Sequence, residues 1–444
     1  MKKAWILVAL SAVSAAAGAQ RVTYPAEEFA ARRQALCRSM GGGLALMFGR
    51  TMPQPASRFR QDNDFYYLTG NEDPNAALAV DAKACDAVLF LPAQNESQLR
   101  VDGPNALKDP EAAKRRGFTA LHPLAYLEEF LARRRSGGPQ RLWVRLSERD
   151  EVDFSRSDEA LYMARRSVSG WGAQPSEDAF RVSLLRDRYP YYELADVSPL
   201  LDRLRLIKTP REIEALRRNG SVSADAIRRA IETTRPGHFE YELEAEATAV
   251  HVRNGAEGAG YPAIVGSGPN VNTWHYQRND RQLQAGDLVV MDYGASFGYQ
   301  TMDITRTWPV SGRFDELQLK AYRAVLEAQK SIIAAMRPGA TRAQTVDICK
   351  RVFEKHGFAD QRPFGAGHYV GMAVHDVGDY ERDGKEVPLE SGMVIAVEPI
   401  IEIKDRQLHV RIEDTVLVTD GAPEVLSAGV PKEVDELLAL VGRR

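Results

Sequence analysis

Two stretches decide the fold of the C-terminal half: Leu288-Val-Val-Met-Asp-Tyr-Gly294 and Met302-Asp-Ile-Thr-Arg-Thr307. Both are rich in apolar and β-branched residues, which predicts two strands, Leu288–Asp292 and Met302–Val310. The glycine-containing segment between them is short enough for a hairpin turn. Each stretch carries one aspartate among residues typical of a buried strand.

The spacing of these aspartates is unusual for a buried hairpin. A turn centred between Phe297 and Gly298 would place Asp292 directly opposite Asp303. Like charges at opposed positions destabilise a strand pair, and apolar surroundings add a desolvation cost. One such pair could still be a dyad that shares a proton.

The same pattern occurs again about a hundred residues later. Strands are expected at Met393–Glu398 and Leu408–Val418, and the midpoint between Glu398 and Glu413 falls in the polar turn Asp405-Arg406. Two opposed acidic pairs in repeated positions favour divalent cations, which would neutralise four carboxylates at once.

His368, in Gly367-His-Tyr-Val-Gly371, is the candidate fifth ligand. Four carboxylates and one imidazole form an oxygen-rich donor set that suits Mn²⁺ and also accepts Co²⁺, Fe²⁺ or Zn²⁺. Carboxylates can bridge two ions that share a hydroxide nucleophile. Each acid alone could be a solvated strand residue or half of an ion pair, but the five together predict two divalent ions.

The helices around these strands also repeat. The first group has a helix start at Thr209-Pro-Arg-Glu212, an Arg-Pro-Gly stop at Arg235 and a second helix at Glu240–Asn254. The second group has a helix from Glu316, an Arg-Pro-Gly stop at Arg337 and a capping sequence at Thr341–Gln344. The stops are 102 residues apart, Asp292 and Glu398 are 106 apart, and Asp303 and Glu413 are 110 apart. This order predicts a duplicated unit folded as two related halves.

The N-terminal part alternates short apolar strands with helical stretches, which predicts a separate α/β domain. Strands are expected at Leu44–Phe48, Ala77–Val80, Ala87–Leu91 and Arg141–Val144, helices at Pro110–Arg116 and Leu124–Arg134, and a loop at Ser136–Pro139. The expected domains span residues 24–200 and 208–440.

The first nineteen residues have the pattern of a cleavable signal peptide. Two lysines precede an apolar run that ends in Ala17-Gly-Ala19, and Gln20 would begin the mature chain. The run is too short to be a membrane span. We therefore expect an exported protein, periplasmic or extracellular, with no membrane attachment in its mature form.

The composition and the cysteines add little to this picture. A net charge of −3 gives no reason to expect nucleic acid as a partner. Cys37, Cys85 and Cys349 are widely spaced and odd in number, so we expect three small buried thiols and no disulfide framework.

The acidic motifs resemble those of the pita-bread metallopeptidases, in which Asp292, Asp303, His368, Glu398 and Glu413 would be the metal ligands. The finer resemblance is to Xaa-Pro aminopeptidases and Xaa-Pro dipeptidases (prolidases). It rests on Val397-Glu-Pro399, Arg411-Ile-Glu-Asp414, Ile264-Val-Gly-Ser-Gly268, Trp274-His-Tyr276, Val374-His-Asp-Val-Gly378 and Phe59-Arg-Gln-Asp-Asn-Asp-Phe-Tyr-Tyr-Leu-Thr-Gly70. The resemblance implies an α/β N-terminal domain, a C-terminal pita-bread fold with pseudo-twofold halves, and an assembly as a homodimer or homotetramer.

The resemblance also implies roles for individual residues. Glu398 would be both a ligand and the general base toward the bridging water, and His375 would donate to the substrate carbonyl or oxyanion. His275 would line the pocket for the residue after the scissile bond. Arg411 would orient Glu413 and contact either the substrate or the groups around the metal ligands. Many relatives have a histidine four residues before the metal-binding one, where this chain has Phe364. Either the loop spacing differs or the histidine is lost, which leaves the details of substrate contact open but not metal binding.

The implied activity is hydrolysis of the bond between an N-terminal residue and a following proline, with proline-containing peptides as substrates. An Xaa-Pro dipeptidase is the first alternative, and a catalytically silent metal-binding adaptor on the same fold is a remoter one. A creatinase-like hydrolase would lack the metal ligands. A methionine aminopeptidase would lack the N-terminal domain.

Overall fold

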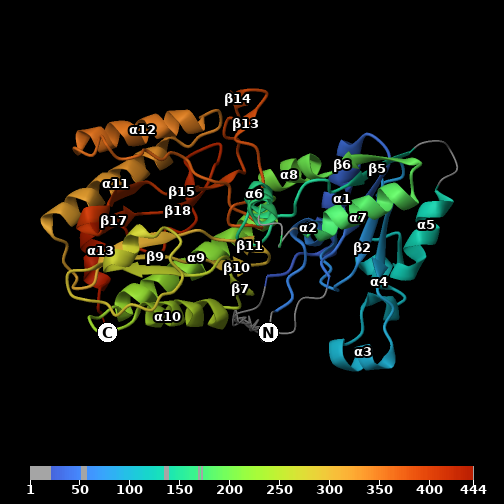
Figure 1. The fold of residues 1–444 in the computed structure, drawn as a ribbon, viewed down its shortest axis with the longest axis horizontal. Helices are drawn as coiled ribbons and strands as arrows, with labels where there is room; N and C mark the ends of the chain where they lie inside the picture. The colour runs from blue at the N-terminus through green and yellow to red at the C-terminus, as the bar shows by residue number, and fades with distance from the viewer. Residues whose placement is uncertain (1–21, 52–57, 135–139, 169–170, 172–173, 444) are drawn as a thin grey trace, which may run out of the picture.

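The computed structural model describes residues 22–51, 58–134, 140–168, 171 and 174–443. Figure 1 shows two lobes, one blue to green and one yellow to red, with helix α8 (Ser198–Leu206) between them. The expected signal peptide, residues 1–19, and the expected loop Ser136–Pro139 lie outside the described residues. Within the described ranges, no helix combines the length and apolar character that crossing a membrane requires.

The first lobe contains a six-stranded sheet in the order β4-β3-β2-β1-β5-β6. Its strands are β1 (Leu44–Phe48), β2 (Ala77–Asp81), β3 (Ala87–Leu91), β4 (Ala120–Pro123), β5 (Gln140–Val144) and β6 (Tyr192–Asp196). The first three form an antiparallel meander, and the other three pair in parallel. The four strands expected from the sequence are confirmed to within one residue at each end.

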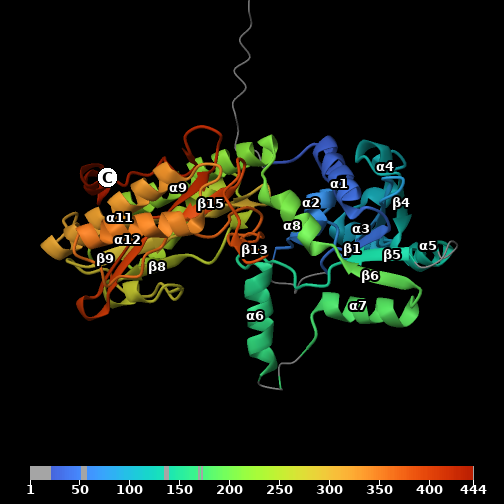
Figure 2. The ribbon, with the colours of Figure 1, turned by 90° about the horizontal axis from the view of Figure 1, so that it is seen from above.

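Helices cover both faces of this sheet (Figure 2). They are α1 (Ala26–Met40), α2 (Asn63–Thr69), α3 (Glu96–Asp102), α4 (Ala112–Arg115), α5 (Leu127–Arg133), α6 (Arg156–Ser167), α7 (Glu177–Arg188) and α8, with the 3-10 turns η1 (Ala106–Lys108) and η2 (Leu124–Tyr126). Because side chains alternate along a strand, Ala45 and Met47 of β1 pack with α1 and α2, whereas Leu44 and Leu46 pack with α7.

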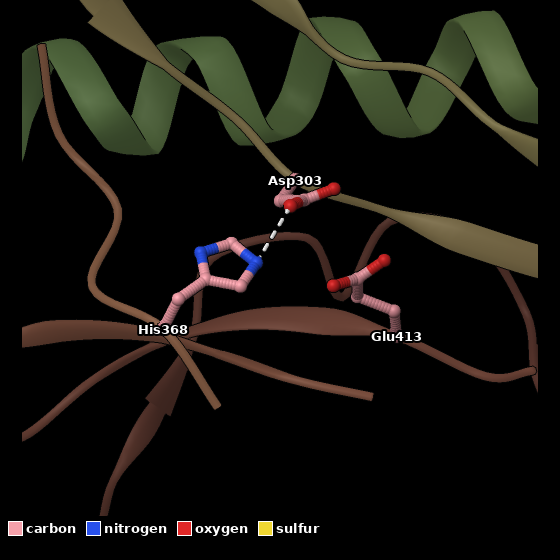
Figure 3. Close-up of side chains that lie close together, drawn as sticks. All are labelled: Asp303, His368 and Glu413. Atoms are coloured by element: carbon pink, nitrogen blue, oxygen red, sulfur yellow. Dashed lines mark ion pairs between the residues drawn. The ribbon is translucent and has the colours of Figure 1, made fainter. Parts of the chain in front are cut away.

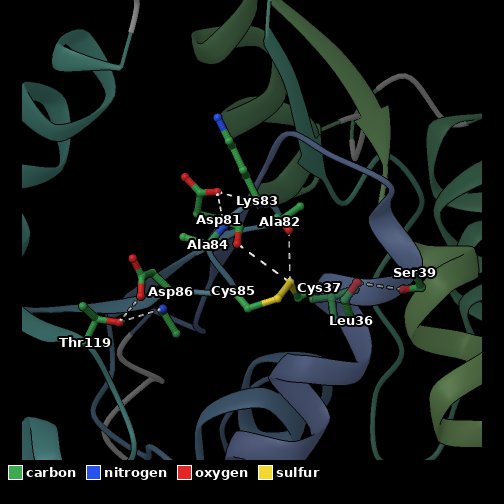
Figure 4. Close-up of a disulfide and its surroundings, with 11 residues drawn as sticks. Leu36, Cys37, Ser39, Asp81, Ala82, Lys83, Ala84, Cys85, Asp86 and Thr119 are labelled. Carbon is green, nitrogen blue, oxygen red and sulfur yellow. Dashed lines mark hydrogen bonds between the residues drawn. A yellow bond between two sulfur atoms is a disulfide. The ribbon is translucent and has the colours of Figure 1, made fainter.

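A disulfide between Cys37 and Cys85 joins α1 to the turn between β2 and β3 (Figure 4). The expectation of three free thiols is therefore wrong for these two. They are 48 residues apart in sequence, but α1 packs across the sheet and brings their Cα atoms to 5.6 Å. Only this packing, which residue spacing does not reveal, makes the bond geometrically allowed. Cys349 is free and buried, as expected.

A buried network of charges connects the two lobes. The Arg205 guanidinium donates to Asp64 at 2.8 Å, to Asp150 at 2.7 Å and to Asp376 at 2.6 Å. Lys208 donates to the second oxygen of Asp376 at 2.8 Å. These side chains are almost inaccessible to water, so loss of one partner would leave an uncompensated buried charge. The network fixes the segment that contains His375.

The helices of the second lobe agree with the repeated pattern. They are α9 (Pro210–Thr233), α10 (Glu240–Arg253), α11 (Glu316–Ala335), α12 (Arg342–Lys355) and α13 (Val434–Leu440). Capping boxes at Thr209–Glu212 and Thr341–Gln344 confirm the expected helix starts. Each Arg-Pro-Gly sequence lies between two helices, the first between α9 and α10 and the second between α11 and α12. Each half therefore begins with two helices.

The strands of this lobe come after each helix pair. They are β7 (Gly258–Ala259), β8 (Ile264–Ser267), β9 (Leu288–Asp292), β10 (Ala295–Phe297), β11 (Gln300–Thr301), β12 (Thr305–Pro309), β13 (Glu381–Arg382), β14 (Lys385–Glu386), β15 (Val394–Val397), β16 (Ile400–Ile403), β17 (Leu408–Arg411), β18 (Asp414–Leu417) and β19 (Glu424–Val425). The two halves meet at a bridge between Thr305 and Glu413. This bridge sets the acidic residues of both halves beside one another.

The register of the second acidic hairpin is the expected one. Val397 pairs with Asp414, and Ile400 pairs with Arg411. Both pairs have the same register, so Glu398 and Glu413, which lie between them, face each other. The turn is the short helix η4 (Lys404–Arg406), where the polar turn was expected.

The register of the first acidic hairpin differs from the expected one. Asp292 pairs with Thr305, and Phe297 pairs with Gln300. The loop is the two-residue turn Gly298-Tyr299, in which both residues have positive φ, as a type I′ turn requires. This turn is centred one residue later than expected, so Asp303 is displaced by two residues from the position opposite Asp292.

Candidate metal centre and active site

Three side chains from separate parts of the second lobe converge in its interior (Figure 3). Asp303 precedes β12, His368 lies in the segment between α12 and β15, and Glu413 lies between β17 and β18. One potential ligand atom from each lies within 4.8 Å of those of the other two. The imidazole Nε2 of His368 is 3.2 Å from Asp303 Oδ2. These residues could hold a metal ion.

Asp292, at the end of β9, joins this group through Tyr261. The Tyr261 hydroxyl lies 2.5 Å from Asp292 Oδ1 and 2.9 Å from Asp303 Oδ1. A phenol has one hydrogen, so it cannot donate fully to both carboxylates at once. Tyr261 belongs to no motif that the sequence singled out, and a lone tyrosine in a loop carries no periodic signal.

Arg411 donates from Nη2 to Asp292 Oδ2 at 2.8 Å. The resemblance led us to expect that Arg411 would orient Glu413, and the observed partner is therefore different. Arg411 ends β17 and Glu413 follows two residues later, before β18, while the end of β9 lies within reach of the long guanidinium side chain. Arg411 thus neutralises part of the aspartate pair.

Glu413 keeps one oxygen without a partner. Its Oε2 accepts a hydrogen bond from Thr305 at 2.6 Å, whereas its buried Oε1 accepts none from the described residues. An unsatisfied buried polar atom costs about 1–3 kcal/mol, and more when it is charged. A cation at this point would remove the cost, and carboxylate oxygens are the ligands that hard divalent ions prefer. The residues present therefore fit such an ion.

Electrostatics in the absence of metal lead to the same conclusion. Burial raises the pKa of Asp292 to about 8, and the charge of Asp303 acts in the same direction. Burial and the neighbouring carboxylates raise the pKa of Glu413 well above its ordinary value. Burial opposes protonation of His368, but the Asp303 carboxylate outweighs it and raises the His368 pKa to about 9. Without added positive charge, the carboxylates cannot all ionise together.

The remaining expected site residues surround a pocket beside this centre. The pocket has a volume of about 80 Å³, and its lining includes His275, His375, Asp292 and Asp303. His275 is exposed at the rim of the pocket. Partial removal of its ring from water lowers its pKa, and the positive charge of Arg411 lowers it further. The ring centroid of His375 lies 4.0 Å from that of His368. Two imidazoles thus border the space next to the acidic cluster.

Glu398 lies across from Glu413 but outside the three-residue group. It is half-buried, and its carboxylate accepts no hydrogen bond from the part of the chain that the structure describes. Its negative charge reaches Glu413, His368 and Arg411. Glu398 is thus the acid of this cluster with the most available lone pairs.

Phe364 packs against aromatic and cationic neighbours at the edge of the site. Its ring centroid is 5.8 Å from that of Trp274, and the Arg362 guanidinium carbon lies 5.0 Å from it. Because Trp274 precedes His275, the Phe364 ring supports the segment that carries this histidine. An apolar contact thus occupies the position where the resemblance implied an imidazole.

Comparison with known proteins matches both lobes. Residues 29–143 match the family model of the aminopeptidase P N-terminal domain, and residues 214–420 match that of metallopeptidase family M24. The chain is 33% identical to a Xaa-Pro aminopeptidase of Haemophilus influenzae, over 93% of this chain and 96% of the relative. It is 32% identical to a Xaa-Pro dipeptidase of Pyrococcus furiosus, over 62% of this chain and 78% of the relative.

The solved structure of Pseudomonas aeruginosa aminopeptidase PepP superposes with a TM-score of 0.78 at 32% identity, covering 95% of this chain and 98% of that one. The fold class expected from the sequence, an α/β N-terminal domain before a C-terminal pita-bread fold, is confirmed. The chain belongs to the Xaa-Pro aminopeptidase family of M24 metallopeptidases.

Proposed function

We propose that this protein is an exported, metal-dependent Xaa-Pro aminopeptidase, which releases an N-terminal residue from a peptide with proline in second place. The observation that carries the proposal is the convergence of Asp303, His368 and Glu413 in a buried acidic cluster. The match to Xaa-Pro aminopeptidases along nearly the whole chain supports the choice of substrate.

The proposed ligands of two divalent ions are Asp292, Asp303, His368, Glu398 and Glu413. Manganese is the proposed metal because the donor set is mostly carboxylate, and cobalt, iron or zinc would also suit it. When bound, the ions supply Lewis acidity that polarises the scissile carbonyl and lowers the pKa of water.

The protein's own residues move the protons. Glu398, with its unoccupied lone pairs, is the proposed base that accepts a proton from the attacking water. His375 donates a hydrogen bond to the carbonyl oxygen as negative charge develops there. His275 borders the pocket for proline, whose nitrogen must gain a proton as it leaves. Arg411 holds Asp292 in place.

An Xaa-Pro dipeptidase is the second candidate. The Pyrococcus dipeptidase matches a smaller share of this chain than the aminopeptidase does. This difference in coverage favours the aminopeptidase, because the match to the aminopeptidase extends over both lobes of the chain. The proposed domains are residues 24–200 and 208–440, and the proposed assembly is a homodimer or homotetramer.

Hydrolysis of matched peptides tests this function. With manganese added, an Xaa-Pro-Xaa tripeptide should be cleaved faster than its Xaa-Ala-Xaa counterpart, by about 1–3 kcal/mol in the free energy of activation. Equal rates would remove the specificity claim. Cleavage confined to Xaa-Pro dipeptides would make the protein a dipeptidase, and no cleavage with any of the four metals would favour the silent adaptor.

Export is proposed from the leader pattern in residues 1–19. The Cys37–Cys85 disulfide supports it, because such bonds persist in oxidising compartments and are rare in the cytosol. N-terminal sequencing of the protein expressed with its own leader should give Gln20 as the first residue. A chain that keeps Met1 and remains in the cytosol would contradict export.

A further inference from the structure

A segment of the first lobe reaches the catalytic pocket of the second. The backbone N–H of Val374 donates to the carbonyl of Val152 at 2.8 Å, and Asp153 and Phe154 line the pocket beside His375. Helix α6 begins directly after this segment. Figure 2 shows one end of α6 near β13 and the rest of the helix projecting away from the body. The helix start is therefore part of the site.

Asp158, in the first turn of α6, lies beside His375. Its Oδ2 is 3.2 Å from the Nδ1 of His375, although 217 residues separate them. The same oxygen accepts a hydrogen bond from the Ser155 hydroxyl at 2.8 Å, and the backbone N–H of Asp158 donates to that hydroxyl at 3.1 Å. This capping box fixes the carboxylate before any substrate arrives.

The chemistry of the contact determines which ring nitrogen carries hydrogen. The hydrogen bond with His375 is the main cause that holds the Asp158 pKa well below its usual range, so the carboxylate acts as an acceptor. Nδ1 of His375 must then donate. With Nδ1–H held in this way, Nε2 is the nitrogen left for the pocket, and it donates to the carbonyl oxygen when the ring carries hydrogen on both nitrogens. A carboxylate in this position fixes both the orientation and the tautomer of an imidazole.

We propose that Asp158 is a positioning residue for His375, so that the first lobe supplies part of the catalytic apparatus. This inference rests on the proposed aminopeptidase function, in which His375 faces the substrate carbonyl. Asp158 need not touch the substrate. It acts by holding the imidazole that does.

Kinetics of Asp158→Ala test the role in the manganese-loaded, full-length enzyme. We expect kcat to fall about tenfold or more, with KM within about twofold of the original value. Asp158→Glu should recover part of the loss, because it keeps the carboxylate. The matched control is Glu159→Ala, which removes a carboxylate from the next position of the same helix start and should retain the original kcat.

A double-mutant cycle separates positioning from a general structural effect. If Asp158 acts through His375, Asp158→Ala combined with His375→Ala should be about as slow as His375→Ala alone. Fully multiplicative losses would overturn the proposal. So would a kcat for Asp158→Ala equal to that of the Glu159→Ala control.

A readout without turnover distinguishes failure of this inference from failure of the proposed function. Ring ¹⁵N shifts of His375 in zinc-loaded protein should show hydrogen on Nδ1, and Asp158→Ala should shift the hydrogen toward Nε2. The same shifts in both proteins would overturn the inference. If the wild type cleaves no Xaa-Pro peptide, the function fails, and these shifts still decide whether Asp158 sets the tautomer.

Discussion

The two acidic hairpins of the second lobe occupy repeated positions in the sequence but have different local chemistry. In the first, Asp292 is partnered by Tyr261 and Arg411, and Asp303 by Tyr261 and His368. In the second, Glu413 keeps a buried oxygen that has no hydrogen-bond partner within the described part of the chain. Each oxygen of the aspartate pair already has a neighbour, whereas the glutamate pair has unoccupied lone pairs.

This difference indicates that the two hairpins of the duplicated unit have different roles. The aspartate hairpin is held in place by protein groups before metal binds. The glutamate hairpin depends on cations to offset its repulsion, and it keeps an acid able to accept a proton. Duplication provides two similar hairpins, and the residues around them, such as Tyr261 and Arg411, make them unequal.

Glu398→Gln should have the largest effect. An amide can still offer a lone pair to a metal but cannot accept a proton from water, so kcat should fall about a hundredfold or more. Circular dichroism and metal content should remain close to those of the wild type. A rate near the original would assign the base to another residue, and the proposed difference in role between the two hairpins would be wrong.

His275 lies before the aspartate hairpin and His375 before the glutamate hairpin, and variants of both extend the comparison of the two hairpins. His375→Ala should lower kcat about tenfold or more, because its hydrogen bond strengthens as charge develops on the carbonyl oxygen. His275→Ala should mainly raise KM, because this residue borders the proposed proline pocket. Steady-state kinetics on one Xaa-Pro tripeptide measure both. A KM effect alone in His375→Ala would make His375 a binding residue.

The stability of metal-stripped protein should also depend on pH. The pKa of Asp292 is about 8 when folded and about 3.9 in model peptides, so the folded state holds an extra proton between these values. Stability should therefore fall as pH rises through this window, by roughly 1.4 kcal/mol per pH unit for each such proton. The raised pKa of His368 acts in the same direction between about pH 6.5 and 9.

Denaturant titration at about pH 5 and pH 8 measures this dependence. The metal-loaded protein is the control, and it should show a flatter profile because the ions replace the protons. Stripped protein whose stability, measured relative to the metal-loaded protein, does not fall toward pH 8 would contradict the charge balance described for the acidic cluster. The comparison is needed because the lowered pKa values of buried His251 and His409 act in both proteins alike.

The register of the glutamate hairpin could be predicted from the sequence, whereas that of the aspartate hairpin could not. In the former, the midpoint between the acids coincides with the polar turn. In the latter, Gly298 and Tyr299 form the turn, which displaces Asp303 by two residues. The Asp292 and Asp303 carboxylates both contact Tyr261, so the symmetry of spacing predicted that they lie close together but predicted the wrong register.

The contacts missed by sequence reasoning all join distant segments. Cys37 meets Cys85 only because α1 crosses the sheet, and Asp158 meets His375 only because the lobes pack together. No periodic pattern marks any of these residues. Strands and helix caps follow local rules and were predictable, whereas partners across lobes depend on tertiary packing.

Metal analysis of chelator-stripped, reconstituted protein tests the central claim most directly. The account predicts about two divalent ions per chain in the wild type and fewer in Asp303→Ala, because Asp303 is one of the proposed ligands. An unchanged stoichiometry in Asp303→Ala, or a wild-type chain that retains no ion, would contradict a dinuclear centre at this site.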